Sequence, residues 1–596
     1  MDRILIQNGT VIDGSGAPGF VADVLIGDGR ILKIGPELGD RPDCAGAEII
    51  DAAGKLVTPG FINMHSHADC SAAMYPNMES TLGQGVTTEF TGHCGLGVAP
   101  IKEHWLYMFP EKKAFRQVNP EPIGGINPYG AYIVPAERMR PAFERAYGQK
   151  LDWATFGEFL DHLRRVRTGA NLATVAGQAH IRLQAMGLDY KRPATEGEIR
   201  AMEDSLEEAM DGGALGLGLG LDYHPGLYAS REELLRLMTL VARRGGIVTA
   251  HTRMRPNDYY QHKANVYESY REFMELGLES GARIHISHIS NAFEVTPKDD
   301  AMEKKGVRRT LALLGQYREQ GLSVTWDVIP YGAFGPFHYP MAASMFQPYV
   351  EQCGGVTAFA EVLKVGNYRQ LIAEEIRGGN HASRGIFTRF NPKGDPEWDT
   401  RQRFTRTKDE TLVGKTIREA AGGKDSLDFL LDLLAEDPQA SIIQLSRRPE
   451  HTPDRDEFVE QQDATIGLDT WTFDYDACLN EEGMPLECGS PATYEGMTAF
   501  LEREKARGVS VETTVQKLTS NAARCLGLTD RGLIREGYAA DLLVVDYDHF
   551  SACQCLADPR HGARGLDYVI VGGQVAVRQK IHTHVRSGRI LQAEKG

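Results

Sequence analysis

The stretch Pro59-Gly60-Phe61-Ile62-Asn63-Met64-His65-Ser66-His67-Ala68-Asp69 joins an apolar run to two histidines one residue apart. Side chains alternate along a strand, so His65 and His67 point to the same side. Imidazole is the commonest protein ligand for zinc and similar metals. A bare His-x-His can equally be an incidental surface pair. Further His, Cys and Asp residues at later strand ends favour the first strand of a metal-dependent hydrolase barrel.

Composition sets the broad class of the protein. A chain of 596 residues can form one large domain plus a second, or a barrel with insertions. Its 42% hydrophobic and 24% charged residues are ordinary for a soluble globular enzyme. The net charge of −16 argues against nucleic acid or an anionic membrane as a partner, because both would be repelled. A small anionic substrate stays compatible, since a metal can override the global field locally.

The first residues and the cysteines indicate a compartment. Residues 1–8 enter a strand-like pattern at once, without a signal-peptide core, and no apolar run reaches membrane-spanning length. The nine cysteines have no regular spacing, which is not typical of a disulfide framework. We therefore expect a cytoplasmic protein without a membrane partner, and a homo-oligomer remains open.

Both ends of the chain are rich in short strands. Asn8-Gly9 and Asp28-Gly29 separate apolar runs, and such pairs are hairpin signals because they tolerate positive φ. Residues 537–546 and 568–575 have the same character near the other end. We expect the two ends, 1–57 and 531–596, to pair into one small β-sandwich domain.

The long middle, residues 58–530, alternates strands with helices. Residues 231–243 have helical spacing and stop at Gly245-Gly246. The expected strands are 213–221, 247–250 before His251, 283–287 before His288, 322–326 before Asp327 and 464–468 before Asp469. This alternation favours the α/β class and a parallel, TIM-like (β/α)₈ barrel.

Two regions fit the barrel poorly and are expected to be insertions. Residues near 101–150 are rich in Pro, Tyr and Arg, and residues near 332–412 are long and irregular. Long insertions on barrel loops are commonly lids or substrate-binding walls. An oligomer contact or surface decoration is an equally good interpretation.

Polar residues at the C-terminal ends of barrel strands converge on one mouth. The candidates are His65, His67, Cys94, His251, His288 and Asp469. Alone, each histidine could be a hydrogen-bonded structural residue, the cysteine a small buried hydrophobe, and the aspartate a helix N-cap. Together, at separate strand ends, they indicate a metal site.

The chain resembles the amidohydrolase superfamily, and within it the N-acyl-D-amino-acid deacylase (D-aminoacylase) family. The resemblance runs through most of the chain. It is carried by residues 60–67, 92–100, 213–223, 251–253, 286–288, 466–469, 518–528 and 532–542.

The resemblance implies a particular metal site. Most superfamily members bridge two metals with a carbamylated lysine on strand 4, but residues 213–221 contain no lysine. The deacylase family uses a strand-2 cysteine instead, and Cys94 stands in that place. A thiolate carries the negative charge that a bridging ligand needs, and zinc accepts sulfur readily. The expected ligands of a tightly bound zinc are Cys94, His251 and His288; His65 and His67, sharing Cys94, would form a weaker second site.

The resemblance also implies roles in catalysis. Asp469 matches the family's strand-8 aspartate, the expected general base and then proton donor to the leaving amine. Tyr223 is a candidate for polarising the scissile carbonyl, or a packing tyrosine at the rim. Arg253 could orient the substrate or pair with a barrel carboxylate. Tyr331 and Ser290 are further candidates for substrate contacts.

Two departures from the family bear on the substrate. Relatives usually follow the strand-6 histidine with a second His and a Lys, whereas this chain reads His288-Ile289-Ser290-Asn291. They also tend to carry His-Pro-Arg after the strand-8 aspartate, where this chain has Ser490-Pro491-Ala492. Basic residues grip a substrate carboxylate, so their loss weakens the case for a free N-acyl-D-amino acid.

Three functions follow from these observations. The first is a zinc-dependent amidohydrolase that cleaves the C–N bond of an N-acyl-D-amino acid or a bulkier N-acyl relative. The second is hydrolysis of a cyclic amide, imide, lactone or carbamate. The third is a non-catalytic barrel scaffold. It is disfavoured because every expected ligand position carries a residue that can bind a metal.

Overall fold

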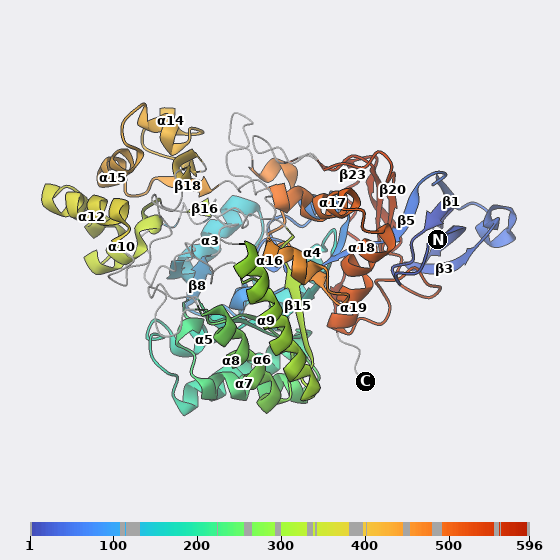
Figure 1. Cartoon of the computed structure of the whole chain (residues 1–596), viewed down its shortest axis with the longest axis horizontal. Coiled ribbons are helices and arrows are strands. Elements are labelled where there is room, and N and C mark those ends of the chain that lie inside the picture. The colour runs from blue at the N-terminus through green and yellow to red at the C-terminus, as the bar shows by residue number, and fades with distance from the viewer. Residues whose placement is uncertain are drawn as a thin grey trace.

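The computed structural model shows a mixed α/β protein (Figure 1). It describes residues 3–107, 114, 118, 132–222, 224–254, 265–291, 300–330, 338–339, 342–380, 397–400, 402–444, 453–478, 491–552, 560 and 562–592. Across these ranges, every helix is either too short or too polar to cross a lipid bilayer.

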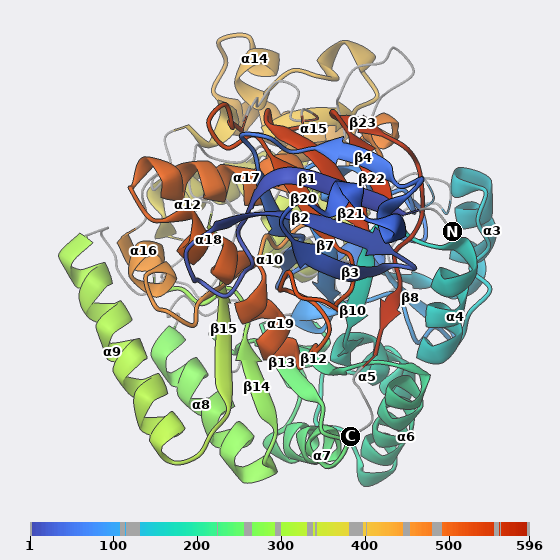
Figure 2. The same ribbon diagram turned by 90° about the vertical axis from the view of Figure 1, so that its right-hand side faces the viewer.

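Strands from both ends of the chain form one nine-stranded sheet (Figure 2). Its N-terminal strands are β1 (Ile4–Val11), β2 (Phe20–Gly27), β3 (Arg30–Gly35), β4 (Glu48–Asp51) and β5 (Leu56–Pro59). Its C-terminal strands are β20 (Leu542–Val545), β21 (Leu566–Val571), β22 (Gln574–Arg578) and β23 (Ile581–His582).

The junction in this terminal sheet is the antiparallel pair of β5 and β20. Val57 faces Val544 in the register, and both are fully buried. Alternate apolar residues of β1, β2 and β20 pack into one core, which removes their side chains from water. The chain therefore enters and leaves the middle region from the same sheet.

The middle region contains parallel strands in the predicted chain order. They are β6 (Phe61–Asn63), β7 (Val86–Thr91), β10 (Asn171–Thr174), β11 (Ala176–Gly177), β12 (Gly216–Gly220), β13 (Ile247–His251), β14 (Arg283–Ile286), β15 (Val324–Val328) and β19 (Thr465–Ile466). Neighbours pair in parallel from β6 to β10 and from β11 to β19. Hydrogen bonds from Met64 N to Ile466 O (3.0 Å) and from Leu468 N to His65 O (3.2 Å) connect the last strand to the first.

Helices cover the outside of these strands. They include α4 (Phe156–Val166), α5 (Gln178–Met186), α6 (Glu196–Gly212), α7 (Arg231–Arg243), α8 (Val266–Ser280), α9 (Asp300–Glu319), α16 (Pro453–Val459), α17 (Pro491–Ala506), α18 (Val511–Leu518) and α19 (Ser520–Leu526). Reciprocal capping boxes start α4 at Thr155 and Glu158, and α6 at Thr195 and Glu198. Both helices also bury an apolar face, so capping and packing each favour a helix over these residues.

Two groups of elements lie outside this order. Near the first predicted insertion, β8 (His104–Tyr107) pairs with β9 (Tyr132–Pro135), followed by α3 (Ala136–Tyr147). Near the second, a separate lobe contains β16 (His338–Tyr339), β17 (Gln402–Arg406), β18 (Ser441–Gln444), α10 (Gln347–Cys353), α11 (Val356–Leu363), α12 (Gly366–Gly378), α14 (Ile417–Ala421) and α15 (Ser426–Glu436). In Figure 1 this lobe lies at the far end of the molecule from the terminal sheet.

The last described strand leaves the terminal sheet. β24 (Ile590–Leu591) pairs in parallel with β10, where Leu172 faces Ile590. The C-terminal segment thus ties the terminal sheet to the start of a middle strand. The predicted domain boundaries, at residues 57/58 and 530/531, stay a prediction.

Candidate metal centre

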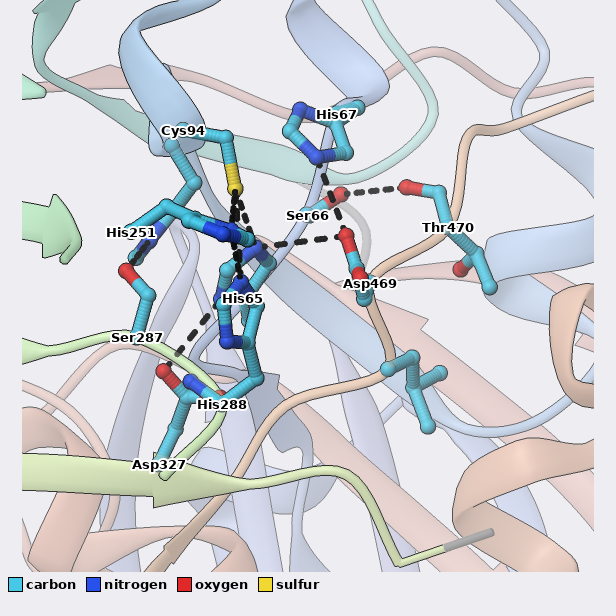
Figure 3. A network of polar contacts seen from close by, with 12 residues as sticks. His65, Ser66, His67, Cys94, His251, Ser287, His288, Asp327, Asp469 and Thr470 are labelled. Carbon is cyan, nitrogen blue, oxygen red and sulfur yellow. Dashed lines mark hydrogen bonds and ion pairs between the residues drawn. The ribbon is translucent and has the colours of Figure 1, made fainter. Parts of the chain in front are cut away.

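The five predicted ligands and Asp469 converge at the C-terminal ends of the parallel strands (Figure 3). Cys94 Sγ lies 3.5 Å from His65 Nε2, 3.8 Å from His251 Nδ1 and 3.5 Å from His288 Nε2. His251 Nδ1 and His288 Nε2 are 2.9 Å apart. One thiol group is therefore surrounded by three imidazole nitrogens that come from three different strands.

Asp469 occupies the opposite side of this cluster. Its Oδ1 lies 3.0 Å from His67 Nε2 and 3.3 Å from His65 Nε2. Its side chain keeps 19% exposure, whereas those of the two histidines are almost fully buried. Asp469 and His288 are the two partly exposed members of the cluster, so a molecule arriving from solvent can reach them.

The backbone turns sharply just after three of the strands. Cys94, His288 and Asp469 have φ values of 56°, 39° and 56°. This region is disfavoured for residues with a Cβ and is often found where function holds a residue in place. The turns direct these three side chains into the common centre, and sequence spacing gives no sign of them.

Close backbone approach lets the turn that carries Cys94 pack onto β12. A Cβ at Gly218 would stand 1.9 Å from Gly92 O, so only glycine fits at this point of the strand. Gly92 itself has φ 86°, and a Cβ there would stand 1.9 Å from Val175 O. The glycine-rich sequence of β12 thereby positions the thiol.

Electrostatics keep the thiol and the carboxylate ionised. Burial alone would raise the pKa of Cys94, but the imidazoles of His65, His251 and His288 hold it well below its usual range. Burial would also raise the pKa of Asp469, but His65 and His67 hold it well below its usual range. Two anionic groups thus face each other across the histidines.

The histidines carry the matching positive charge. Burial works against their protonation, but Asp469 and Cys94 raise the pKa of His67 to about 9, and Asp327, Asp469 and Cys94 raise the pKa of His65 well above its usual value. A buried centre that attracts positive charge to imidazoles around a thiolate fits a metal cation, which displaces those protons on binding. Thiolate and imidazole are the donor types that zinc prefers.

Two buried aspartates outside the predicted set orient the histidines. Asp327 Oδ2 lies 3.3 Å from His65 Nδ1, and Asp327 Oδ1 accepts a hydrogen bond from the His288 backbone N–H (3.0 Å). Asp222 Oδ2 lies 3.7 Å from His251 Nε2. Each of these carboxylates lies nearest the ring nitrogen that does not face Cys94, and Asp327 is close enough to hold a proton on His65 Nδ1 and leave Nε2 for a metal. Asp327 follows a predicted strand, so the strand-end rule could have found it.

His93 is a third residue that sequence reasoning missed. Its ring lies 4.1 Å from that of His65, and its Nδ1 lies 3.0 Å from Ser287 Oγ. Burial and the surrounding histidines hold its pKa well below its usual range. A neutral ring at this position supports His65 without adding charge.

The predicted substrate contacts are less closely tied to the centre. Arg253 donates to Leu227 O and to Ala229 O (3.0 Å), and it pairs with Glu272 (3.3 Å). These contacts favour the carboxylate-pairing alternative for Arg253. Ser290 is buried, with its backbone held by the Tyr270 hydroxyl. Tyr223 and Tyr331 lie outside the described residues.

A buried carboxyl behind the centre connects three strands. Glu89 Oε2 accepts from Asn63 Nδ2 (2.7 Å), and Asn63 Oδ1 accepts from the backbone N–H groups of His65 (3.3 Å) and Leu468 (2.9 Å). Burial raises the pKa of Glu89 from 4.5 to about 7. This network holds β6, β7 and the segment before Asp469 in register.

We expect Glu89→Gln to flatten the dependence of stability on pH. The folded state holds the Glu89 proton more tightly than the unfolded state does, so stability falls as pH rises from 4.5 to about 7. Above that range the buried carboxylate costs roughly 3 kcal/mol, by the pKa difference. The melting temperatures of wild type and variant, measured from about pH 5 to 8, should diverge in favour of the variant as pH rises. Parallel curves would show that Glu89 does not titrate there.

Comparisons with known proteins agree with this geometry. A family model described as the amidohydrolase family matches residues 48–333 and 488–577. D-aminoacylase of Alcaligenes xylosoxydans xylosoxydans is 28% identical over 590 residues, covering 99% of this chain and 97% of the relative. N-acyl-D-aspartate deacylase of the same organism is 27% identical, covering 96% and 91%.

A solved structure shares the fold across the full chain. It is N-acyl-D-glutamate deacylase from Bordetella bronchiseptica, complexed with zinc and a phosphonate inhibitor that mimics the tetrahedral intermediate. The TM-score is 0.69 at 24% identity, with 100% of each chain covered.

Proposed function

The chain belongs to the amidohydrolase family, and from this premise we propose that it is a zinc-dependent hydrolase of an N-acyl-D-amino acid or of a bulkier N-acyl relative. The observation that carries the proposal is the buried Cys94 thiolate facing imidazoles from three strands, with Asp469 on the other side. The names of the relatives support the substrate class. The phosphonate complex supports attack of water on an acyl carbon.

We assign the ligands as the family resemblance implies. Cys94, His251 and His288 would hold the tightly bound zinc, and His65 and His67 would share Cys94 in a weaker site. When bound, zinc polarises the scissile carbonyl and makes a water acidic enough to react near neutral pH. Its donors would come from strands that close into a (β/α)₈ barrel, flanked by a β-sandwich from the chain ends.

Asp469 carries the proton through the reaction. Its carboxylate takes a proton from the attacking water as the new C–O bond forms at the acyl carbon. It then gives that proton to the amine nitrogen as the C–N bond breaks, which leaves a carboxylic acid and a free amine. The contact with His67 orients Asp469, and its lowered pKa means that the carboxylate is ionised and has an open position for the proton. Tyr223 is our candidate for polarising the carbonyl.

Substrate recognition is the open part of the proposal. Among the described residues, no lysine or arginine forms a hydrogen bond or ion pair with His65, His67, Cys94, His288 or Asp469. These described contacts offer a free substrate carboxylate no cationic partner, and cyclic amides, imides, lactones and carbamates are the second candidate class.

Amine release from a substrate panel tests the function. The panel contains N-acyl-D-amino acids, N-acyl-L-amino acids and amidated versions without the carboxylate. We expect turnover of the D-substrates. Turnover of the amidated compounds alone would mean that the site excludes a substrate carboxylate. No turnover of any member by zinc-loaded protein would contradict the proposal and move the search to ring opening of cyclic substrates.

We expect Asp327→Asn to weaken zinc binding by about 10–100-fold, as is usual for groups that orient metal ligands. An amide cannot accept from the His65 ring, the His285 ring and the His288 backbone together. Competition with a chromophoric chelator measures the zinc affinity without relying on turnover. Asp463→Asn is the control, because its exposed carboxylate pairs with Arg318 before the neighbouring strand β19. Equal affinities of Asp327→Asn and wild type would exclude the orienting role.

A further inference from the structure

A cavity lined by arginines lies at the other end of the parallel strands from the metal centre. It has a volume of about 390 Å³, and its walls include Arg164, Arg167, Arg586 and Arg589. Thr168 in its wall comes just before β10, whereas the centre lies after the C-terminal ends of the strands. The cavity is therefore separate from the proposed catalytic site.

The charge of this cavity is opposite to that of the protein. The chain has 81 acidic and 65 basic residues, yet the described walls carry four arginines and no aspartate or glutamate. Arg164, Arg167 and Arg589 are exposed, so water screens part of their charge, but the cavity keeps an excess of positive charge. The arrangement thus indicates a place for a negatively charged molecule.

Two of the arginines are held in position by the protein. Arg164 pairs with Asp161 (2.6 Å) and donates to Gly212 O (3.1 Å). Arg586 donates to Asn77 Oδ1 (2.8 Å) and to Val166 O (3.4 Å). These bonds use part of each guanidinium and fix its direction.

The guanidinium groups of Arg167 and Arg589 make no hydrogen bond or ion pair within the described part of the chain. The backbone of Arg589 is nevertheless fixed: its N–H donates to Asn171 Oδ1 (3.0 Å), and its carbonyl accepts from Leu172 N (2.9 Å). Arg167 N donates to Leu163 O (2.9 Å) at the end of α4, so both charged groups with available donors stand on a hydrogen-bonded backbone at the cavity.

Helix-end stabilisation explains only part of the cluster. Arg164 lies in the last turn of α4, where a basic side chain interacts favourably with the helix dipole. Arg586 and Arg589 come from the C-terminal segment, which runs past this helix to pair as β24 with β10. Their presence at the same cavity needs another reason.

We propose that this cavity binds a small polyanion bearing phosphate groups. Guanidinium forks match phosphate oxygens in bidentate geometry, and arginine is enriched at phosphate sites for this reason. The volume is within the range of small-molecule sites. A bound anion would link α4, the turn between β21 and β22, and the C-terminal segment, so it would stabilise the contact between the terminal sheet and the parallel strands. The proposal does not depend on the hydrolase reaction.

Calorimetric titration of the zinc-loaded full chain with pyrophosphate tests the proposal. Wild type should bind one equivalent, and Arg167→Gln/Arg589→Gln should bind at least roughly tenfold more weakly, because charge-assisted hydrogen bonds are lost. The matched control is Arg165→Gln/Arg578→Gln. This control also removes two positive charges, one from α4 and one from β22. Both of its arginines pair with carboxylates, and neither lines the cavity. This control should bind as wild type does.

Three results would overturn the proposal. One is the absence of binding to wild type at millimolar pyrophosphate. Another is equal weakening in both double variants, which would reflect only net charge. The third is unchanged binding in Arg167→Gln/Arg589→Gln, which would mean that pyrophosphate binds at another site, such as the zinc. The melting temperature of each variant without pyrophosphate verifies that it is folded.

Discussion

Asp469→Asn should lower kcat by on the order of 10³-fold while the tightly bound zinc is retained. The amide cannot take a proton from the attacking water, and the expected ligands Cys94, His251 and His288 remain in place. Amine release gives kcat, and atomic absorption gives the zinc content of the same sample.

The matched control for this variant is Asp463→Asn. Asp463 lies just before β19, and its carboxylate pairs with Arg318 away from the centre. It should leave both kcat and zinc content unchanged. A near-normal kcat for Asp469→Asn would remove the proton-carrying role of Asp469, whatever the metal content.

Cys94→Ala should lower turnover strongly because zinc binds much more weakly without the thiolate. The thiolate is the anionic donor that lies between the imidazoles. If each ligand contributes an equal share of the binding free energy of a structural zinc, its loss should lower the zinc affinity by roughly 10²–10³-fold. Chelator competition measures the loss directly. The variant should also lose the stabilisation that zinc gives to the folded protein.

Cys353→Ala provides the comparison for the cysteine variant. Cys353 is another free cysteine, at the end of α10 in the separate lobe. It should bind zinc as wild type does. If Cys94→Ala binds zinc equally well, the thiol is a packing group and the histidines and Asp469 hold the metal alone.

The order of several middle strands was predictable because each of them ends on or just before a residue with distinctive chemistry. The apolar runs before His251, His288 and Asp469 are β13, β14 and β19, and they pair in the expected sequence. The joint terminal sheet followed from strand-like composition at both ends. The lobe between β16 and β18 was not predictable in detail, since its short strands pair with residues far along the chain.

The centre was only partly predictable for a different reason. Spacing identifies which residue follows a strand, so His65, Cys94 and Asp469 were found. It does not reveal the left-handed turns or the approach of Gly92 to Gly218, which direct those side chains. Nor does it distinguish a carboxylate that faces a ligand's second nitrogen, such as Asp222, from any other buried aspartate.

X-ray absorption at the zinc edge of the purified protein identifies the atoms that bind the metal. We expect one sulfur ligand at about 2.3 Å, together with imidazole nitrogens at about 2.0–2.1 Å. The sulfur signal should disappear in Cys94→Ala and persist in Cys353→Ala. A wild-type spectrum with only nitrogen and oxygen ligands would contradict the assignment of Cys94 and, with it, the proposed metal centre.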